Sequence, residues 1–268
     1  MKTIVITGST RGLGFELSKC FRNKGWNIVL NGKSEVGMND ALEKLLSIES
    51  KAGVTGYCGS ITETDNIKVL IDKAVSEFGS IDIWVNNAGV NQPMKALWEL
   101  SEKEIDTLLN IDLRAAVMGT ILVKRQMETQ TNGGMIYSIE GYGSNDAMML
   151  GLNMYGTSKR ALTHFTRAFA KELNETGSKV RIGRLSPGIM ITDFTVRSLG
   201  GQGEIELPEK TKKIYNILGD YPDVVASFLS EKMICNTKND AHIEWLTGRK
   251  AAWRFMTAGF HKRNFFPT

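Results

Sequence analysis

The chain has 268 residues, and its 33 lysines and arginines against 29 aspartates and glutamates give a net charge of +4 with histidine neutral. With 42% hydrophobic and 23% charged residues, the composition is that of a globular protein and excludes a disordered or collagen-like chain. The small positive excess contains no long run of like charge, so nucleic acid is not expected as a partner.

The cysteines and histidines predict neither disulfides nor a metal site. Three cysteines are an odd number, none lies in a CxxC pair, and the three histidines are far apart along the sequence. No apolar stretch is long enough to cross a bilayer, and the first residues lack the pattern of a signal peptide. These features predict a protein of the reducing cytoplasm without a transmembrane segment.

Strand-like and helix-like segments alternate along the chain. Apolar and β-branched runs predict strands at residues 3–6, 27–30, 54–57, 81–85, 135–139 and 180–185. Helical spacing of apolar residues predicts helices between them, at residues 15–21, 42–48, 66–78, 105–127 and 154–173. Repeated strand–helix units without a linker imply an α/β fold, a single domain over residues 1–268 with a doubly wound parallel sheet.

A glycine-rich turn follows the first strand. Gly8, Gly12 and Gly14 lie between this strand and the first helix. There a nucleotide-binding fold brings backbone close to a pyrophosphate, and the free N–H groups of the helix end point at the phosphates. The alternative is a glycine turn that binds no ligand.

The end of the second strand distinguishes the two nicotinamide dinucleotides. An NAD site usually places an acid there, on the ribose 2′-hydroxyl. This chain has Asn31-Gly32-Lys33 instead, and Lys33 with Arg11 supplies positive charge that suits a 2′-phosphate. We therefore predict NADP(H) as cofactor, against the alternative that both cations are solvated surface charges.

Three further motifs complete a pattern. They are Asn86-Asn87-Ala88-Gly89, Tyr155-Gly156-Thr157-Ser158-Lys159 and Pro187-Gly188-Ile189-Met190-Ile191-Thr192, after the fourth, fifth and sixth strands. Together with the glycine turn, over about the first 195 residues, they resemble the short-chain dehydrogenase/reductase family. These motifs and the tail from Trp245 to Phe266 are similar to the chlorophyll b reductase branch of that family. The resemblance implies a single-domain Rossmann-type sheet, a nicotinamide cofactor and reversible hydride transfer between a carbonyl and an alcohol.

The resemblance also implies which residues hold the dinucleotide. Ser60 stands where the family often has an acid that meets the adenine, and Ile189 and Thr192 match positions that hold the nicotinamide carboxamide. Lys159 would bind the nicotinamide ribose. The expected cofactor-binding set is Gly8, Ser9, Thr10, Arg11, Gly12, Leu13, Gly14, Lys33, Ser60, Ile61, Asn87, Ala88, Gly89, Tyr155, Lys159, Pro187, Gly188, Ile189 and Thr192.

Tyr155 and Lys159 predict the chemistry from their spacing. Four residues apart at the start of a helix, their side chains share one face and lie one turn apart. A nearby ammonium favours the phenolate, so we expect the pKa of Tyr155 to move from about 10 toward neutrality and Tyr155 to be the proton donor. The alternative is a pair on the helix surface without a catalytic role.

One departure from the family pattern concerns the donor that polarises the substrate carbonyl. The family's serine should fall within Glu140-Gly141-Tyr142, and none of these is serine. Ser144 or Tyr142 could replace it. Losing one such donor costs roughly a hundred- to a thousandfold in rate, so we expect a substitute donor or a slow enzyme.

A second departure is Asp112, which stands at the family's usual asparagine position. Asp112 could hold a water next to Lys159, but its charge would weaken the pull of the lysine on Tyr155. Asn110 is two residues away, and positions two apart on a helix do not share a face. Asn110 therefore cannot simply take the role of the family's asparagine.

The segments expected around the substrate are apolar or divergent. The methionine-rich residues 147–154 could line an adaptable pocket or belong to the core or a subunit interface. Residues 194–221 form an excursion in the position of a lid. In the tail, about residues 241–268, aromatic side chains interleave with basic ones. The tail could fold back onto the domain, cap the substrate pocket or make a peripheral contact with a membrane surface.

We therefore predict an NADP(H)-dependent oxidoreductase that acts on a bulky apolar carbonyl or alcohol. Tyr155 is its expected acid/base, and Lys159, Ser144 and Asp112 are its other candidate catalytic residues. The family likeness predicts a homodimer or homotetramer. The missing serine and Asp112 favour a second hypothesis, a non-catalytic dinucleotide-binding sensor or scaffold protein.

Overall fold

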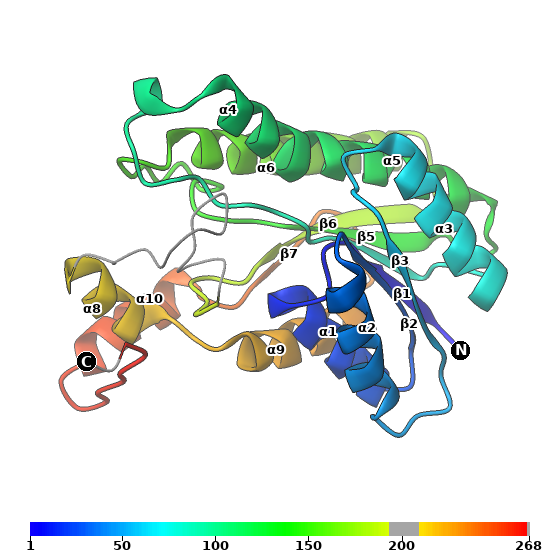
Figure 1. The fold of residues 1–268 in the computed structure, drawn as a ribbon, viewed down its shortest axis with the longest axis horizontal. Coiled ribbons are helices and arrows are strands. Elements are labelled where there is room, and N and C mark those ends of the chain that lie inside the picture. The colour runs from blue at the N-terminus through cyan, green and yellow to red at the C-terminus, as the bar shows by residue number, and fades with distance from the viewer. Residues whose placement is uncertain (193–208, 267–268) are drawn as a thin grey trace.

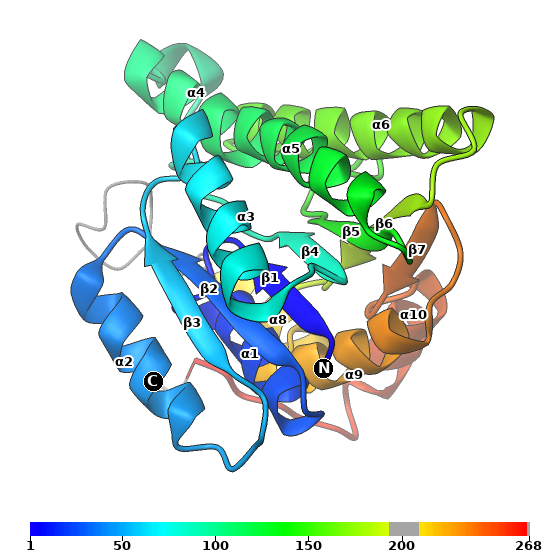
Figure 2. The same cartoon turned by 90° about the vertical axis from the view of Figure 1, so that its right-hand side faces the viewer.

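The computed structural model describes residues 1–192 and 209–266. Its described strands form one sheet in the order β3-β2-β1-β4-β5-β6-β7, and all neighbouring strands are parallel. The strands are β1 (Thr3–Ile6), β2 (Asn27–Gly32), β3 (Val54–Cys58), β4 (Ile83–Asn86), β5 (Gly134–Ile139), β6 (Val180–Ser186) and β7 (Ala241–Glu244). The sheet is twisted, with β3 and β7 at its two edges (Figure 2).

Helices cover both faces of this sheet (Figure 1). One face carries α1 (Gly12–Asn23), α2 (Glu35–Leu46) and α9 (Pro222–Cys235), and the other carries α3 (Thr64–Phe78), α5 (Ala115–Thr129) and α6 (Asn153–Glu175). The remaining elements are the 3-10 helix η1 (Leu97–Glu99), α4 (Glu102–Leu108), the π-helix η2 (Leu109–Arg114), α8 (Glu209–Leu218) and α10 (Gly248–Thr257). The predicted doubly wound α/β sheet is confirmed.

A hydrophobic cluster fills each interface between sheet and helices. Leu17 and Phe21 of α1 and Leu229 of α9 are fully buried against one face, and Leu70 of α3 and Val123 of α5 against the other. Strands covered on both faces read as continuous apolar runs, which is why β1 is Thr3-Ile4-Val5-Ile6 with every residue buried.

The structure adds α8, α9 and α10 to the predicted helices, and it differs from the prediction at one strand and one helix. The sequence predicts six strands, and β7 adds a seventh that alternates partly buried Ala241 and Ile243 with His242 and Glu244, a pattern too short to stand out. The single helix predicted over residues 105–127 is three segments, because the chain passes from α4 through the π-helical turn η2 into α5. That turn places Asp112 in the interior, where it is 1% exposed.

The strands are parallel, so their carboxyl ends meet at one side of the sheet, on the left in Figure 1. The start of α6, α8 and α10 gather at that side (Figure 1). Of the expected lid, residues 193–208 lie outside the described part of the chain, and residues 209–221 form α8 and the turn into α9. In such folds ligands bind beyond the carboxyl ends of the strands.

A buried polar cluster joins β5, β6 and β7 at this side. Glu140, 7% exposed, directly follows β5. Its carboxylate accepts hydrogen bonds from Ser186 and, at 3.0 Å, from Thr163 of α6, and it pairs with Arg184 at 3.3 Å and His242 at 2.9 Å. Burial opposes ionisation, but His242, Ser186 and Arg184 outweigh it and lower the pKa of Glu140 to about 2.

Glu140→Gln should therefore reduce stability above acid pH. A carboxyl whose pKa falls from 4.5 to about 2 on folding stabilises the native state above pH 4.5, and this contribution is lost as the pH falls toward about 2. We expect the variant to lose about 1–3 kcal/mol of unfolding free energy at neutral pH and to show a flatter acid limb in urea unfolding. Glu77→Gln, on the surface of α3, is the matched control; equal acid limbs in native and Glu140→Gln protein would contradict the assignment.

Candidate active site

The glycine turn and the Asn86–Gly89 motif hold each other in place. The Asn87 Nδ2 donates hydrogen bonds to the carbonyl oxygens of Thr7 and Gly8, at 2.8 and 3.0 Å. Gly8 has a φ of +61°, and a Cβ there would lie 2.8 Å from the Ala88 Cα. A Cβ at Gly14 would lie 2.5 Å from the Asn87 Nδ2. Side chains are therefore excluded where these backbones meet.

The end of β2 is joined to the same turn. Asn31 is buried, its carbonyl accepts from the Ser9 N–H at 2.8 Å, and its Oδ1 accepts from the Gly8 N–H at 3.2 Å. The Asn31 Nδ2 donates to the carbonyl of Gly59 at 3.0 Å. The side-chain amide of Asn31 thus binds a donor and an acceptor at the same time. The position where an NAD site usually carries an acid here connects the end of β2 to the glycine turn and to the loop after β3.

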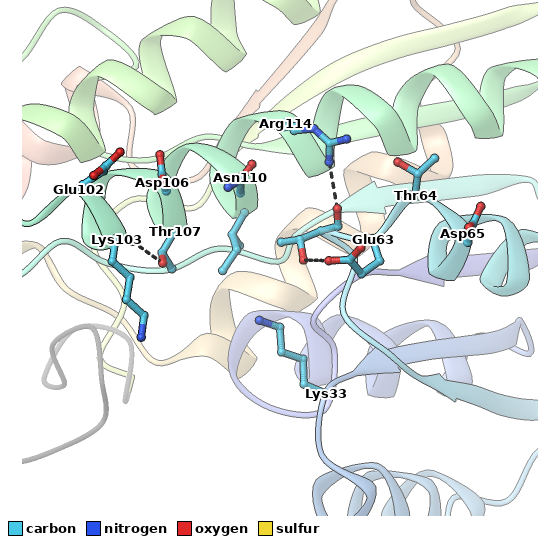
Figure 3. Close-up of a pocket in the computed structure, with 12 residues that line it drawn as sticks. Lys33, Glu63, Thr64, Asp65, Glu102, Lys103, Asp106, Thr107, Asn110 and Arg114 are labelled. Atoms are coloured by element: carbon cyan, nitrogen blue, oxygen red, sulfur yellow. Dashed lines mark hydrogen bonds between the residues drawn. The ribbon is translucent and has the colours of Figure 1, made fainter.

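A cavity of about 790 Å³ opens next to this junction. Figure 3 shows Lys33 pointing into it from below and Arg114 above, where the Arg114 Nη1 donates to the Thr62 carbonyl at 2.9 Å. Ser60, next to this wall, has its Oγ 2.8 Å from the Thr62 Oγ1. Arg11 is exposed at the N-cap of α1 and does not line the cavity.

These features fit a dinucleotide. The close backbone approach at Gly8 and Gly14 and the start of α1 suit a pyrophosphate, and the cavity beside Lys33 has the size of a nucleotide subsite. A Cβ at Gly12 would meet no atom within 4 Å, so the turn is open on that side. Among the described residues, no group of three or more His, Cys, Asp and Glu side chains could hold a metal ion.

Tyr155 and Lys159 lie together on α6 as their spacing predicts. Both side chains are buried, at 7% and 5% exposure, and the Lys159 Nζ lies 5.5 Å from the centre of the Tyr155 ring. The same Nζ is 3.8 Å from the Asp112 Oδ2, and the Asp112 Oδ1 accepts from the Val90 N–H at 2.8 Å. A Cβ at Gly89 would lie 3.3 Å from the Asp112 Oδ1 and 3.5 Å from the Lys159 Nζ, so a glycine suits that position.

The electrostatics of this pair differ from the expectation. Burial raises the pKa of Tyr155 above its usual value, and the charges of Asp112 and of Tyr215 on α8 raise it further. Burial also raises the pKa of the Asp112 carboxyl, against the opposing charge of Lys159. The prediction of a lowered Tyr155 pKa is therefore wrong for this structure, because desolvation and a carboxylate outweigh the lysine.

Gly141 is a residue of the site that sequence reasoning did not single out. A Cβ at this position would lie within van der Waals overlap of the Tyr155 hydroxyl oxygen and 3.2 Å from the Lys159 Cγ. The backbone after β5 thus packs directly on the phenol. Counting from the fifth strand and counting back from Tyr155 give different positions within Glu140-Gly141-Tyr142, and the packing shows that position 141 faces the hydroxyl.

The two candidate replacements for the missing serine are engaged elsewhere in their own loop. The Ser144 Oγ accepts a hydrogen bond from the Gly141 N–H at 3.1 Å, and its side chain is buried. The Tyr142 hydroxyl donates to the Met148 carbonyl at 3.0 Å, and its ring is partly exposed. Ser144 stays a candidate catalytic residue because its backbone turn touches Gly141, which contacts Tyr155.

Gln92 is a second residue that the sequence did not indicate. It is fully buried after the Asn86–Gly89 motif, and its Oε1 accepts from the Tyr155 N–H at 3.0 Å. Helix α6 has no side-chain cap from its own N-cap residue, Leu152, so Gln92 satisfies one of the free N–H groups of the first turn. The loop after β4 therefore orients the helix that carries Tyr155.

The segment after β6 is fixed by residues from the C-terminal half. The Asp220 N–H donates to the Ile189 carbonyl and the Ile191 N–H donates to the Asp220 carbonyl, both at 3.0 Å. A Cβ at Gly188, whose φ is +73°, would lie 2.7 Å from the Leu246 Cβ. The residues expected to hold the nicotinamide thus rest on Asp220 and on the chain beyond β7.

The tail folds back onto the domain through the carboxylate of Asp220. Asp220 accepts from the Trp245 Nε1 at 2.7 Å, the Arg254 Nη1 at 2.7 Å and the Arg263 Nη1 at 3.1 Å. Folding back, one of the expected alternatives for the tail, is confirmed. The methionine-rich loop is not core, since Met148 and Leu150 are 91% and 94% exposed.

Comparisons with known proteins decide the family. The profile of the short chain dehydrogenases matches residues 2–201. The chain belongs to the short chain dehydrogenase family. This membership places it among oxidoreductases.

Curated relatives support the expected branch. The chain is 30% identical over 261 residues to chlorophyll(ide) b reductase NOL of Oryza sativa subsp. japonica, covering 95% of this chain and 74% of that protein. It is 28% identical over 280 residues to the probable chlorophyll(ide) b reductase NYC1 of the same plant, covering 99% of this chain and 54% of that protein. The chain therefore spans about half the length of NYC1. Both relatives are named chloroplastic.

Solved structures share the fold. An alcohol dehydrogenase from Thermococcus sibiricus, complexed with 5-hydroxy-NADP, superposes with a TM-score of 0.76 at 22% identity, covering 91% of this chain and 96% of that one. A 7α-hydroxysteroid dehydrogenase complexed with NADH and 7-oxo glycochenodeoxycholic acid gives a TM-score of 0.77 at 23% identity, covering 92% and 93%. None of the helices described for this chain combines the length and apolar character that a membrane span requires.

The charge of Asp112 should set the alkaline limit of the reaction. Because this charge raises the pKa of Tyr155, Asp112→Asn should lower that pKa, and the optimum of the variant should lie at lower pH than that of the native protein. Steady-state turnover of NADPH across pH measures this. Asp72→Asn, exposed on α3, is the control, and an unchanged or higher optimum in Asp112→Asn would refute the coupling.

The packing of Gly141 on the phenol predicts a specific loss of turnover. In Gly141→Ala the new methyl group must displace the Tyr155 hydroxyl, and displacement of a catalytic group by about 1 Å can cost about a hundredfold in kcat. We expect that loss with little change in melting temperature. Gly248→Ala, where a Cβ would meet no atom within 4 Å, should keep native turnover. Native kcat in Gly141→Ala would show that the contact has no catalytic consequence.

Proposed function

We propose that this protein is an NADP(H)-dependent reductase that transfers hydride to the carbonyl of a bulky apolar substrate. The observation that carries the proposal is the buried group of Tyr155, Lys159 and Asp112 beside the loop that contacts the glycine turn. Carbonyl reduction by a nicotinamide needs a proton donor, a cation beside it and a binding site for the dinucleotide. The Tyr155 phenol, the Lys159 ammonium and the glycine turn would supply these three.

The residues of the chain divide the work as follows. The glycine turn and the start of α1 would bind the pyrophosphate, with Ser60 and Ile61 beside the adenine and Lys159 beside the nicotinamide ribose. The bound nicotinamide would supply the hydride. Tyr155 gives its proton to the oxygen of the developing alkoxide, and Lys159 stabilises the phenolate that remains. Gln92 and Gly141 orient the phenol.

The state of Tyr155 favours the reductive direction. Burial and Asp112 raise its pKa, so the phenol is protonated at neutral pH. A protonated phenol is ready to donate to an alkoxide, whereas oxidation of an alcohol requires the phenolate to accept a proton. The phenol is thus in the form that reduction requires at the start of the reaction.

The substrate class rests on the surroundings of the site and on the relatives. The loop before α6 exposes Met148 and Leu150, and Tyr215 of α8 lies close enough to Tyr155 to influence its pKa. The relative NOL is named a chlorophyll(ide) b reductase and NYC1 a probable chlorophyll(ide) b reductase. A bulky conjugated aldehyde or ketone is therefore the class to test first. Location in the cytoplasm and assembly as a homodimer or homotetramer stay predictions.

Turnover of a ketone and aldehyde panel tests the function. We expect the native protein to consume NADPH with at least one bulky apolar carbonyl and Tyr155→Phe to bind NADPH with native affinity but lose turnover by about three orders of magnitude. Cofactor absorbance measures turnover, and fluorescence of bound NADPH measures binding. Binding without any turnover that depends on Tyr155, across a panel that includes pigment aldehydes, would favour the sensor or scaffold hypothesis.

Lys33 should determine the preference between the two dinucleotides. Its ammonium lines the cavity where a 2′-phosphate would lie, and a hydrogen bond to a charged group is worth about 1.5–3 kcal/mol, or roughly ten- to a hundredfold in affinity. Lys33→Ala should raise the KM for NADPH by that factor and leave the KM for NADH unchanged. Lys44→Ala, exposed on α2, is the control; an equal effect on both cofactors would contradict the assignment.

A further inference from the structure

Helix α10 presents its charged side to the protein and its apolar side to solvent. Lys250, Arg254 and Thr257 recur at helical spacing on the inner side, where Arg254 binds Asp220. The Lys250 Nζ lies 2.8 Å from the centre of the Trp245 ring. A surface helix of a globular protein normally has the opposite polarity, with its apolar stripe against the core.

The outer face of α10 consists of four large apolar side chains. They are Trp253, Phe255, Met256 and Phe260, which are 63%, 51%, 69% and 89% exposed. Trp253, Met256 and Phe260 recur at intervals of three and four, so they form one stripe along the helix and the turn after it. Single exposed apolar residues are ordinary on protein surfaces, but a contiguous group marks an interaction surface.

The charged residues of the tail from Trp245 onward are all basic. From Trp245 to the end of the sequence there are five lysines and arginines and no aspartate or glutamate. Arg249, His261 and Lys262 are exposed beside the stripe, and Lys210 and Lys213 are exposed on α8, which contacts α10. Such a face is complementary to a surface that is negatively charged and covers an apolar interior.

We propose that the outer face of α10 docks on the surface of an anionic lipid bilayer. A short helix with an exposed aromatic stripe bordered by cations lies in the interface of a bilayer, with the aromatic side chains among the acyl chains and the cations at the headgroups. A second copy of this chain fits less well. A symmetric contact through this face would bring two basic tails together, and like charges facing each other oppose association.

The anchoring of α10 makes this surface rigid and places it beside the site. Arg254 and Arg263 bind Asp220, and the backbone of Asp220 pairs with Ile189 and Ile191 of the loop expected to hold the nicotinamide. α10 lies at the side of the sheet where the carboxyl ends of the strands meet (Figure 1). Docking through α10 would therefore bring the side of the sheet that carries the candidate active site close to the lipid, where apolar substrates concentrate.

Vesicle sedimentation of the full chain, without substrate, tests the proposal. The probes are vesicles of phosphatidylcholine alone and of phosphatidylcholine with phosphatidylserine in equal parts. We expect the native chain to sediment with the anionic vesicles and much less with the neutral ones. Trp253→Ser combined with Phe260→Ser should lower the partition coefficient about tenfold or more, since each side chain loses apolar burial. Arg249→Gln combined with Lys262→Gln should lower binding to the anionic vesicles only.

Two controls separate this result from the proposed function. Leu46→Ser removes an exposed apolar side chain from α2, at the β3 edge of the sheet and away from α10 (Figure 2), and should bind vesicles as the native chain does. The melting temperature of the Trp253→Ser and Phe260→Ser variant, measured without vesicles, reports folding independently of lipid and of catalytic activity. Failure of the proposed oxidoreductase function would leave the sedimentation result unaffected.

Three outcomes would overturn the proposal. The native chain could fail to sediment with anionic vesicles, which would exclude a lipid surface as the partner of this face. The Trp253→Ser and Phe260→Ser variant could bind as tightly as the native chain. The native chain could be a dimer in size-exclusion chromatography that this variant converts to monomer, which would assign the face to a second copy.

Discussion

The buried contact between Lys159 and Asp112 is the interaction on which the site depends. It joins α6 to the π-helical turn η2, and through the Val90 N–H it joins both to the loop after β4. Neither charge is solvated, so each requires the other, and removing one partner of a buried pair is costly. A π-turn in place of regular α-helix, frequent at functional sites, is the local distortion that brings the carboxylate inward.

This contact also explains why the phenol behaves differently from the simple expectation. A lysine one turn from a tyrosine lowers the pKa of the phenol only if the charge of the lysine is not already compensated. Here Asp112 compensates it, and burial adds to the effect, so Tyr155 is held in its protonated form. The same carboxylate that positions Lys159 thus suits the site to donate a proton rather than to accept one.

The parts of the fold that depend on local spacing could be predicted from the sequence. Strand β1 was predicted at its exact bounds, and β2 to β6 within two residues at each end, because buried parallel strands are continuous apolar runs between glycine turns. The pairing of Tyr155 with Lys159 likewise follows from helical geometry. The hydrogen bonds from Asn87 to the glycine turn agree with the expected role of that asparagine in fastening neighbouring backbone.

The parts that depend on contacts between distant segments could not be predicted. Gln92 caps a helix that begins about sixty residues later, and no local pattern marks it. Gly141 matters only because the loop after β5 passes over the Tyr155 hydroxyl. No glycine or proline in residues 108–114 marks the π-turn at Asp112, so the sequence indicates one helix where there are three segments.

Asp220 shows how such a long-range contact connects the divergent tail to the shared part of the fold. Its backbone forms hydrogen bonds with the loop after β6, and the residue as a whole is 8% exposed. Its carboxylate binds two arginines and a tryptophan from the tail. A buried carboxylate needs such donors, and the tail supplies them by turning the basic side of α10 inward. An amphipathic helix whose polar side is used in this way must leave its apolar side outside. The exposed aromatic stripe is therefore a consequence of how the tail is anchored to the loop expected to hold the nicotinamide.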